Sequence, residues 1–256
     1  MKERYQEQGY VLIRNFLSDN EVLELRAILN EFHHLWQQEN SSFYAEKAVN
    51  SAYLTTNKFL NNAQRNHLFS FIGSEKVMAL VNELLPKQPC FLNTQLFFNP
   101  MQDQQTNYWH RDPQYHLSIE QQQAALAAFD VIHFRLPVMD EPGIELIPGT
   151  HKRWDSTEEL DVRLEQNDHK NNEALSQGNV IKLAAGDLLI FSANMIHRGL
   201  YGMDRLAFDI LFCPPGPSVI KFVDEDCLPA EDTLQNIENP SAFRNTIKLK
   251  SALNKS

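Results

Sequence analysis

The stretch YWHRDPQYH, residues 108–116, places a histidine and an aspartate two positions apart, at His110 and Asp112. Side chains alternate between the two faces of a β-strand, so this pair can turn an imidazole nitrogen and a carboxylate oxygen towards one metal ion. Trp109 and Arg111 would then point the other way. Two histidines and one carboxylate are the ligands of many non-haem Fe(II) oxygenases, which keep open positions for substrate and O2. This interpretation requires a second histidine from elsewhere in the chain.

His197 is the candidate for that second histidine, because it follows GDLLIFSANMIH, in which a glycine turn precedes an apolar strand. A His-x-Asp triplet arises easily by chance among nine histidines, but this is the only His-x-Asp or His-x-Glu in the chain. The letters HRD also occur in the catalytic loop of protein kinases. The chain has no Asp-Phe-Gly, no glycine-rich loop and no correctly spaced Asn, which excludes a kinase.

Arg205 is the candidate for binding an anionic cosubstrate, eight residues after His197 and at the start of the strand-like segment LAFDILFC. Enzymes with this metal centre hold the far carboxylate of 2-oxoglutarate with a buried base. A guanidinium suits that role because its planar fork binds a carboxylate through two hydrogen bonds and stays charged when desolvated. The alternative is a surface arginine that pairs with Asp204 or Asp209.

The elements expected to position these residues are short strands. Five segments are rich in β-branched and aromatic residues and are bounded by Gly, Pro, Asn or Asp: CFLNTQLFF, FDVIHFRLPV, NVIKLAA, GDLLIFS and LAFDILFC. Upstream, Ser18 and Glu21 have capping-box spacing before an apolar helical repeat, and Ser74 to Leu85 reads as a second helix that ends before Pro86. The pattern predicts a mainly β fold with flanking helices, an antiparallel barrel or jelly roll.

One domain is expected over residues 1–256, since the chain has no internal repeat and no Gly/Ser linker. Residues 151–178 are polar and charged, which predicts an insertion between strands or a lid. Residues 214–256 follow CPPGPS and are predicted to form a C-terminal surface appendage.

The composition limits the possible partners. A formal net charge of -10 repels phosphate backbones and argues against nucleic acid. No run of about 18 apolar residues is present, so no membrane span is expected. Three widely spaced cysteines do not form a disulfide framework, and the start of the chain lacks an apolar signal segment. We expect a cytoplasmic monomer or homodimer that acts on a small molecule.

Four ordered segments resemble the phytanoyl-CoA dioxygenase family of Fe(II)/2-oxoglutarate-dependent oxygenases, over roughly residues 5–213. They are YQEQGYVLIRNFLSDNEVLELR, YWHRD, EPGIELIPGTHK and GDLLIFSANMIHRGL with DRLAF. The resemblance implies a double-stranded β-helix, a cupin-like jelly roll. It also implies that His110, Asp112 and His197 bind Fe(II), that Arg205 binds 2-oxoglutarate, and that O2 is the second cosubstrate.

Two further polar residues and the outcome of the reaction follow from the same resemblance. Gln95 and Asn99, in TQLFFN, resemble cosubstrate-binding positions, although each is also typical of a barrel wall or a turn. The implied reaction is hydroxylation of an unactivated C–H bond of a small or medium metabolite, with release of succinate and CO2. Halogenase relatives lack the carboxylate ligand, so Asp112 argues against halogenation.

Three positions depart from the family pattern. Gly199 stands two residues after the distal histidine, where the family often has a serine that helps to hold the cosubstrate. Arg205 is closer to His197 than is usual, so the intervening turn is short. Thr150 replaces a serine in the PGTHK loop, which is a conservative change.

The substrate is the least determined part of the prediction. Candidate contacts flank the metal segment or lie on a neighbouring strand: Tyr108, Tyr115, His116 and Arg135. For Arg135 a structural ion pair is an equal alternative, and for the others ordinary packing is. His151 and Trp154 are expected at the rim of the pocket. Two other functions stay open, namely a non-oxidative metal-binding cupin-like protein and an inactive family member that senses a ligand.

Overall fold

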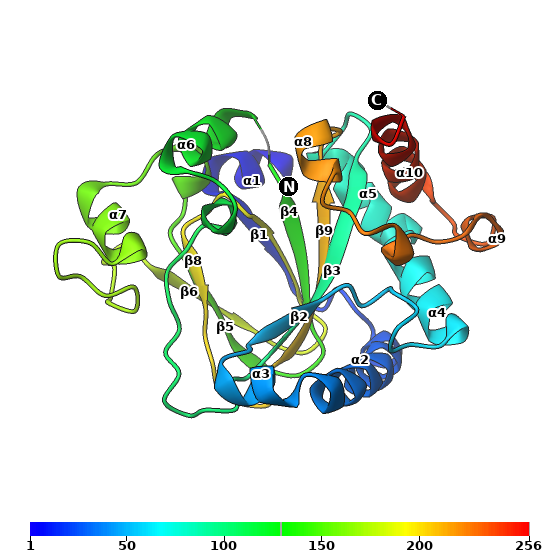
Figure 1. Ribbon diagram of the computed structural model, residues 1–256, viewed down its shortest axis with the longest axis horizontal. Coiled ribbons are helices and arrows are strands. Elements are labelled where there is room, and N and C mark those ends of the chain that lie inside the picture. Colours follow the sequence, from blue (N-terminus) through cyan, green and yellow to red (C-terminus); the bar gives the residue numbers. More distant parts are fainter. Residues whose placement is uncertain (129, 256) are drawn as a thin grey trace.

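Two antiparallel β-sheets face each other in the computed structural model, which describes residues 1–128 and 130–255 (Figure 1). The larger sheet has the order β1 (Tyr10–Ile13), β7 (Leu188–Ser192), β4 (Ile132–Pro137), β9 (Leu206–Cys213), β3 (Cys90–Phe98), β2 (Asn50–Ala52). The smaller sheet has the order β6 (Asn179–Leu183), β5 (Glu141–Leu146), β8 (His197–Gly199). The predicted jelly roll is confirmed.

Helices cover the outer face of the larger sheet (Figure 1). They are α2 (Asp19–Glu39), α4 (Asn62–Ile72), α5 (Glu75–Leu84) and α10 (Ser241–Leu253). The capping box at Ser18 and Glu21 forms as predicted, since each satisfies a free N–H of the first turn of α2. The other helical elements are α1 (Lys2–Gln8), α3 (Ser41–Glu46), η1 (Asp112–Tyr115), α6 (Ile119–Ala128), η2 (Thr150–Lys152), α7 (Thr157–Leu164), α8 (Pro217–Ile220), η3 (Glu225–Cys227) and α9 (Glu231–Leu234).

The strands of the larger sheet separate apolar from polar side chains by their alternation. Phe134 on β4 and Ile210 on β9 belong to the core that the helices cover. Their neighbours His133, Arg135 and Asp209 are buried too, but they point to the opposite face, towards the smaller sheet. The space between the sheets therefore carries buried charge, and charge at that depth requires partners.

The segment 151–178 lies between β5 and β6 and is fastened to the metal-binding stretch, and we call it the brace. The fully buried carboxylate of Asp155 accepts hydrogen bonds from Arg111 (2.6 and 2.8 Å) and from Arg163 on α7 (2.7 and 2.9 Å). The Trp109 indole N–H donates to the Glu173 carbonyl at 2.8 Å. Trp109 and Arg111 thus point away from the metal position, as their parity predicts, and hold this segment in place.

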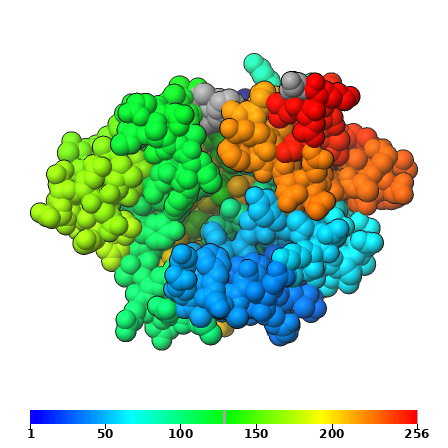
Figure 2. Space-filling model, in the orientation of Figure 1, coloured from blue at the N-terminus to red at the C-terminus, as the bar shows by residue number. Residues whose placement is uncertain are grey.

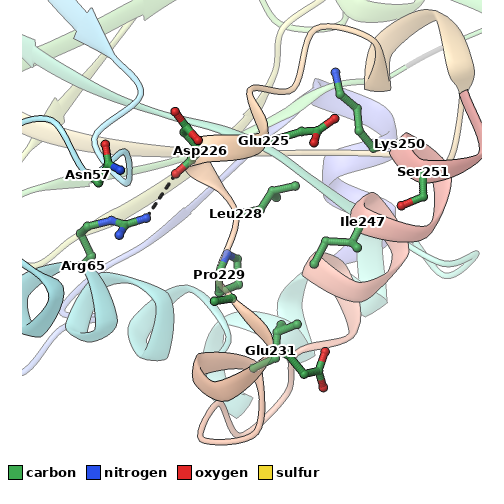
Figure 3. Close-up of a pocket in the computed structure, with 12 residues that line it drawn as sticks. Asn57, Arg65, Glu225, Asp226, Leu228, Pro229, Glu231, Ile247, Lys250 and Ser251 are labelled. Atoms are coloured by element: carbon green, nitrogen blue, oxygen red, sulfur yellow. Dashed lines mark hydrogen bonds between the residues drawn. The ribbon is translucent and has the colours of Figure 1, made fainter. Parts of the chain in front are cut away.

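The C-terminal residues from 214 onward complete the core, in contrast to the predicted surface appendage. Phe243 and Thr246 on α10 are buried, and the Thr246 hydroxyl donates to the Phe91 carbonyl at 2.7 Å. The amphipathic helix α10 covers β3, because that end of the sheet would otherwise be exposed. A surface pocket of about 460 Å³ lies between α4, α10 and residues 225–231 (Figure 3), and none of the predicted site residues lines it.

No helix within residues 1–128 and 130–255 combines the length and the apolar character that crossing a bilayer requires.

Candidate active site

His110, Asp112 and His197 come together as the spacing predicts. The Nε2 atoms of His110 and His197 lie 3.5 and 3.6 Å from the Asp112 Oδ1 atom, and the two imidazole rings are 4.3 Å apart. The backbone differs from the expected continuous strand. His110 pairs with His197 through one isolated β-bridge, which extends the smaller sheet beyond β8, and Asp112 begins the 3-10 turn η1. The carboxylate reaches the histidines because the chain turns there.

Each histidine is oriented by a backbone carbonyl. The Nδ1 atom of His110 lies 3.1 Å from the Tyr108 oxygen, and that of His197 lies 3.0 Å from the Met195 oxygen. A carbonyl oxygen only accepts, so both Nδ1 atoms carry the proton and both Nε2 lone pairs stay available. These are the two atoms that face Asp112 Oδ1.

Burial prepares the charge state of the ligands. Desolvation lowers the pKa of His110 and lowers that of His197 to about 3, so both rings are neutral near pH 7. Burial by itself raises the pKa of Asp112, but its hydrogen bond to His133 and the surrounding histidines outweigh this and leave its pKa well below the usual range. Metal ligation requires these protonation states, neutral imidazole and ionised carboxylate.

The three donors fit a first-row transition metal. The set offers two imidazole nitrogens and one carboxylate oxygen on one side of the cation, the pattern of facial-triad iron sites. A metal held at about 2.1 Å keeps adjacent octahedral ligands about 3 Å apart, so the observed separations need only small adjustments. The Asp112 side chain is 32% exposed and that of His197 only 7%, so the site opens towards the surface on the Asp112 side.

His133 supports the carboxylate ligand and was not among the predicted site residues. Its Nε2 atom lies 2.8 Å from Asp112 Oδ2, and its Nδ1 atom lies 3.2 Å from Asp209 Oδ2. Burial lowers the pKa of this histidine, but the two carboxylates outweigh burial and raise it to about 9. Outer partners of this kind fix the orientation of a ligand. The sequence did contain a signal for this role, because a histidine inside the apolar strand VIHFRLPV is expected to need a polar partner.

Arg205 is buried, with 4% of its surface exposed, and the nearest carboxylate in an ion pair with it is Glu141, not Asp204 or Asp209. Its Nη1 atom donates to the Phe98 carbonyl at 3.0 Å. Its Nε atom lies 3.5 Å from Glu141 Oε2 and has no hydrogen-bond partner among the described residues. Burial and the nearby Arg135 lower its pKa to about 10, so it stays a cation near pH 7. An incompletely paired buried guanidinium suits an anionic ligand.

Two of the departures from the family pattern, Gly199 and the short turn before Arg205, have one structural explanation. A Cβ atom at position 199 would lie 2.6 Å from the Nη2 atom of Arg205, closer than side chains approach each other. The arginine therefore occupies space that a serine at this position would need.

The other predicted cosubstrate residues have different surroundings. Asn99 braces the turn before Arg205, because its side chain accepts from Gly202 N at 2.9 Å and donates to the Met203 carbonyl at 2.7 Å. This is the turn role that the sequence left open as the alternative. Gln95 is half-buried on β3, directly opposite Asp209 in the ladder.

Arg135, a predicted substrate contact, lies in a buried ion pair. Its Nε and Nη2 atoms donate to the two carboxylate oxygens of Glu141 at 2.9 and 3.1 Å, and Nη1 lies 3.5 Å from Asp209. The alternative of a structural ion pair thus describes its position. Together, His133, Arg135, Glu141, Arg205 and Asp209 form what we call the inter-sheet polar cluster.

Two tyrosine rings lie beside the metal ligand His110. Tyr108 and Tyr115 lie with ring centroids 5.2 and 5.6 Å from that of His110. His116 stacks on Phe222, with 5.8 Å between the ring centroids, and this contact joins η1 to the segment after α8.

Figure 2 shows a hollow at the centre of the face that is drawn. It is bordered by the green segment around α6, the orange segment around α8 and the blue segment around α3.

Tyr201 is a neighbour of the site that sequence reasoning missed. The Arg205 guanidinium carbon lies 5.4 Å from the centre of its ring, and burial raises the pKa of its phenol to about 12. Trp154 packs over Arg111 and Arg163 instead of at an open rim. His151, also expected at the rim, is buried against the N-terminal segment.

A jelly roll with two histidines and a carboxylate gathered at one site defines the class of cupin-like metal-binding proteins, which includes the non-haem oxygenases. The sequence profile described as phytanoyl-CoA dioxygenase (PhyH) matches residues 5–200, and the chain belongs to this family. Comparison with curated protein sequences finds no match.

Several solved structures share the fold at low sequence identity. EctD from S. alaskensis, with 2-oxoglutarate and 5-hydroxyectoine, is 13% identical, covers 94% of this chain and 84% of its own, and has a TM-score of 0.61. AviO1 from Streptomyces viridochromogenes Tue57 is 16% identical, with coverages of 84% and 93% and a TM-score of 0.59. The epimerase SnoN from nogalamycin biosynthesis is 16% identical, with coverages of 83% and 80% and a TM-score of 0.53.

Proposed function

We propose that this protein is an Fe(II)- and 2-oxoglutarate-dependent dioxygenase that hydroxylates an unactivated C–H bond of a small or medium metabolite and releases succinate and CO2. The observation that carries the proposal is the combination of a three-ligand metal site with a buried, incompletely paired arginine. A metal site without oxidative chemistry has no need of such an arginine. EctD, a structural neighbour, was crystallised with 2-oxoglutarate, which supports the same cosubstrate here.

The residues of the site have separate proposed roles. Iron, 2-oxoglutarate and O2 supply the oxidising chemistry when they are bound. His110, Asp112 and His197 would hold the metal ion. Arg205 would bind the far carboxylate of 2-oxoglutarate and so orient the cosubstrate. The surrounding protein then orients one C–H bond of the substrate and excludes water.

The substrate is proposed to enter through the hollow of Figure 2 and to contact the aromatic side chains beside His110. Tyr108, Tyr115 and Tyr201 offer ring faces and hydroxyl groups, and His116 lies further out. Arg111, Arg135 and Arg163 already have close carboxylate partners, and Arg205 is assigned to the cosubstrate. These features favour a substrate that is recognised through ring packing and hydroxyl hydrogen bonds rather than through a strong charge.

Binding of the cosubstrate tests the proposal without knowledge of the substrate. Anaerobic protein with Fe(II) should develop a visible charge-transfer band when 2-oxoglutarate is added, and Arg205→Ala should lose most of it. Arg244→Ala, which removes a surface arginine paired with Glu231, is the matched control and should keep the band. Metal binding without any band in the wild-type protein would favour the non-oxidative alternative.

Analysis of the products tests the outcome of the reaction. SnoN and SnoK are described as an epimerase and a carbocyclase, so members of this fold group give different products. Hydroxylation adds one oxygen atom from O2, whereas epimerisation leaves the mass unchanged and ring closure removes two hydrogens. Mass spectrometry after incubation with isotopically labelled O2 and a substrate library separates these results. Succinate formation with an unlabelled, isomeric product would contradict hydroxylation.

A further inference from the structure

The guanidinium of Arg205 is held from several sides by the protein itself. Phe98 accepts from Nη1 at 3.0 Å, and Glu141 lies 3.5 Å from Nε. On the Nη2 side the chain has Gly199, and a Cβ atom there would come within 2.6 Å. The guanidinium carbon also lies 5.4 Å from the ring centre of Tyr201. The orientation of the fork is therefore set before any ligand arrives.

Glu141 poses a problem for an anion site, because a carboxylate beside Arg205 competes with the carboxylate of a ligand. Arg135 resolves this competition. It holds both oxygens of Glu141 at 2.9 and 3.1 Å, whereas Arg205 lies at 3.5 Å, too far for a strong hydrogen bond. The negative charge of Glu141 is largely taken up by Arg135. Arg205 keeps positive charge for a ligand and still has an anchor for its Nε edge.

The backbone around Arg205 is matched to this arrangement. The turn before it is short, and Asn99 holds that turn through Gly202 and Met203. The guanidinium lies so close to β8 that any Cβ atom at position 199 would come within 2.6 Å of Nη2 and would force the fork to shift. A larger side chain would push Nη2 away from β8.

We propose that Glu141 is a positioning residue for the cosubstrate-binding arginine, with Arg135 as its counterion and Gly199 as the residue that leaves room for the guanidinium. This inference rests on the proposed function, because it assigns the ligand of Arg205 as the carboxylate of 2-oxoglutarate. Neither Glu141 nor Gly199 touches the cosubstrate; both act through the place and direction of the fork.

The test measures binding, not turnover. Protein loaded with Mn(II) is titrated with 2-oxoglutarate by calorimetry, and the Kd for Mn(II) alone is measured separately. Glu141→Gln should raise the Kd for 2-oxoglutarate at least about tenfold and leave the Kd for Mn(II) unchanged. Glu145→Gln is the matched control, because Glu145 lies on the same strand and pairs with Arg198 instead. That control should bind 2-oxoglutarate like the wild type.

Gly199→Ala keeps every charge and adds one methyl group, so it tests the position of the fork even if Glu141→Gln fails to fold. It should also raise the Kd for 2-oxoglutarate about tenfold or more, with little change for Mn(II). Unchanged 2-oxoglutarate binding in either folded variant overturns the inference. Equal losses for 2-oxoglutarate and Mn(II), or an equal loss in Glu145→Gln, would also overturn it, because they indicate general damage. A wild-type protein that binds Mn(II) but not 2-oxoglutarate overturns the proposed function as well.

Discussion

His133 offers the sharpest test of how the protein prepares its metal site. The substitution His133→Phe keeps an aromatic ring in contact with Phe191, on which the imidazole stacks at 4.6 Å, and removes the hydrogen bond to Asp112. Asp112 would then be free to rotate, so that Oδ1 no longer faces the two histidines. The substitution also removes the 3.2 Å contact with Asp209, which keeps Arg135 at 3.5 Å as its remaining partner. Some loss of stability is therefore expected beside the loss of metal affinity. Metal affinity should fall because the ligand is no longer held.

The size of the effect follows from the contact. The 2.8 Å bond joins a buried imidazole to a carboxylate, and hydrogen bonds to charged groups contribute about 1.5–3 kcal/mol. Since about 1.4 kcal/mol corresponds to a factor of ten, the metal Kd should rise by about 10- to 150-fold. Losses of about 10- to 100-fold are typical when a partner of a metal ligand is removed. His133→Gln, whose amide can donate to one carboxylate, should recover part of the loss.

The assay is competition for Mn(II) or Fe(II) against a chelator of known affinity, under anaerobic conditions for iron. Circular dichroism establishes that each variant is folded. His67→Phe, which changes a surface histidine near Glu24, controls for the loss of an imidazole as such. A metal Kd for His133→Phe within about twofold of the wild type would refute the view that Asp112 needs this support.

Three further predictions concern pH and stability. Burial lowers the pKa of His197 to about 3, so its neutral form persists far below pH 6.5. The metal Kd should therefore stay nearly constant between pH 8 and about 6, as calorimetry at several pH values can measure. A steep loss of metal affinity near pH 6.5 would contradict this. Asp155→Asn leaves two buried arginines without their shared anion and should lower the free energy of unfolding by about 3–5 kcal/mol in urea, whereas an unchanged midpoint would mean that the brace contributes nothing. Gly143→Ala should abolish soluble expression, because Gly143 has φ +97° and a Cβ atom would lie 1.8 Å from the Ile181 carbonyl; a well-expressed, cooperatively unfolding variant would contradict this.

The metal ligands could be predicted because each belongs to a recognisable stretch of sequence. His110 and Asp112 are neighbours in the chain, and His197 ends an apolar strand that the turn residues delimit. The predicted backbone was wrong at Asp112, which begins a 3-10 turn instead of continuing a strand. Both backbones place the His110 and Asp112 side chains on the same side. The two-residue spacing therefore predicts that the two side chains lie close together, but it does not predict the backbone conformation that places them there.

The peripheral segments were harder to interpret because their partners lie far away in the chain. Residues 151–178 are polar throughout, yet one buried aspartate, Asp155, attaches them to Arg111. Composition does not distinguish a polar segment that solvent covers from one held by buried ion pairs. In the same way, the buried face of α10 becomes visible only when β3 is placed beneath it.

The partners within the inter-sheet polar cluster could not be predicted from the sequence, because they depend on which strands lie next to each other. Alternation along β4 places His133 and Arg135 on the inner face, but the pairing of Arg135 with Asp209 depends on β9 lying next to β4. Glu141 comes from the opposite sheet. A buried charge in this space is tolerated only with a partner, and the cluster meets that condition nearly everywhere. The exception is Arg205, whose Nε atom has no hydrogen-bond partner among the described residues. Incomplete pairing inside an otherwise well-paired cluster is what an anion site requires, and it supports the proposed role of Arg205 in binding the cosubstrate.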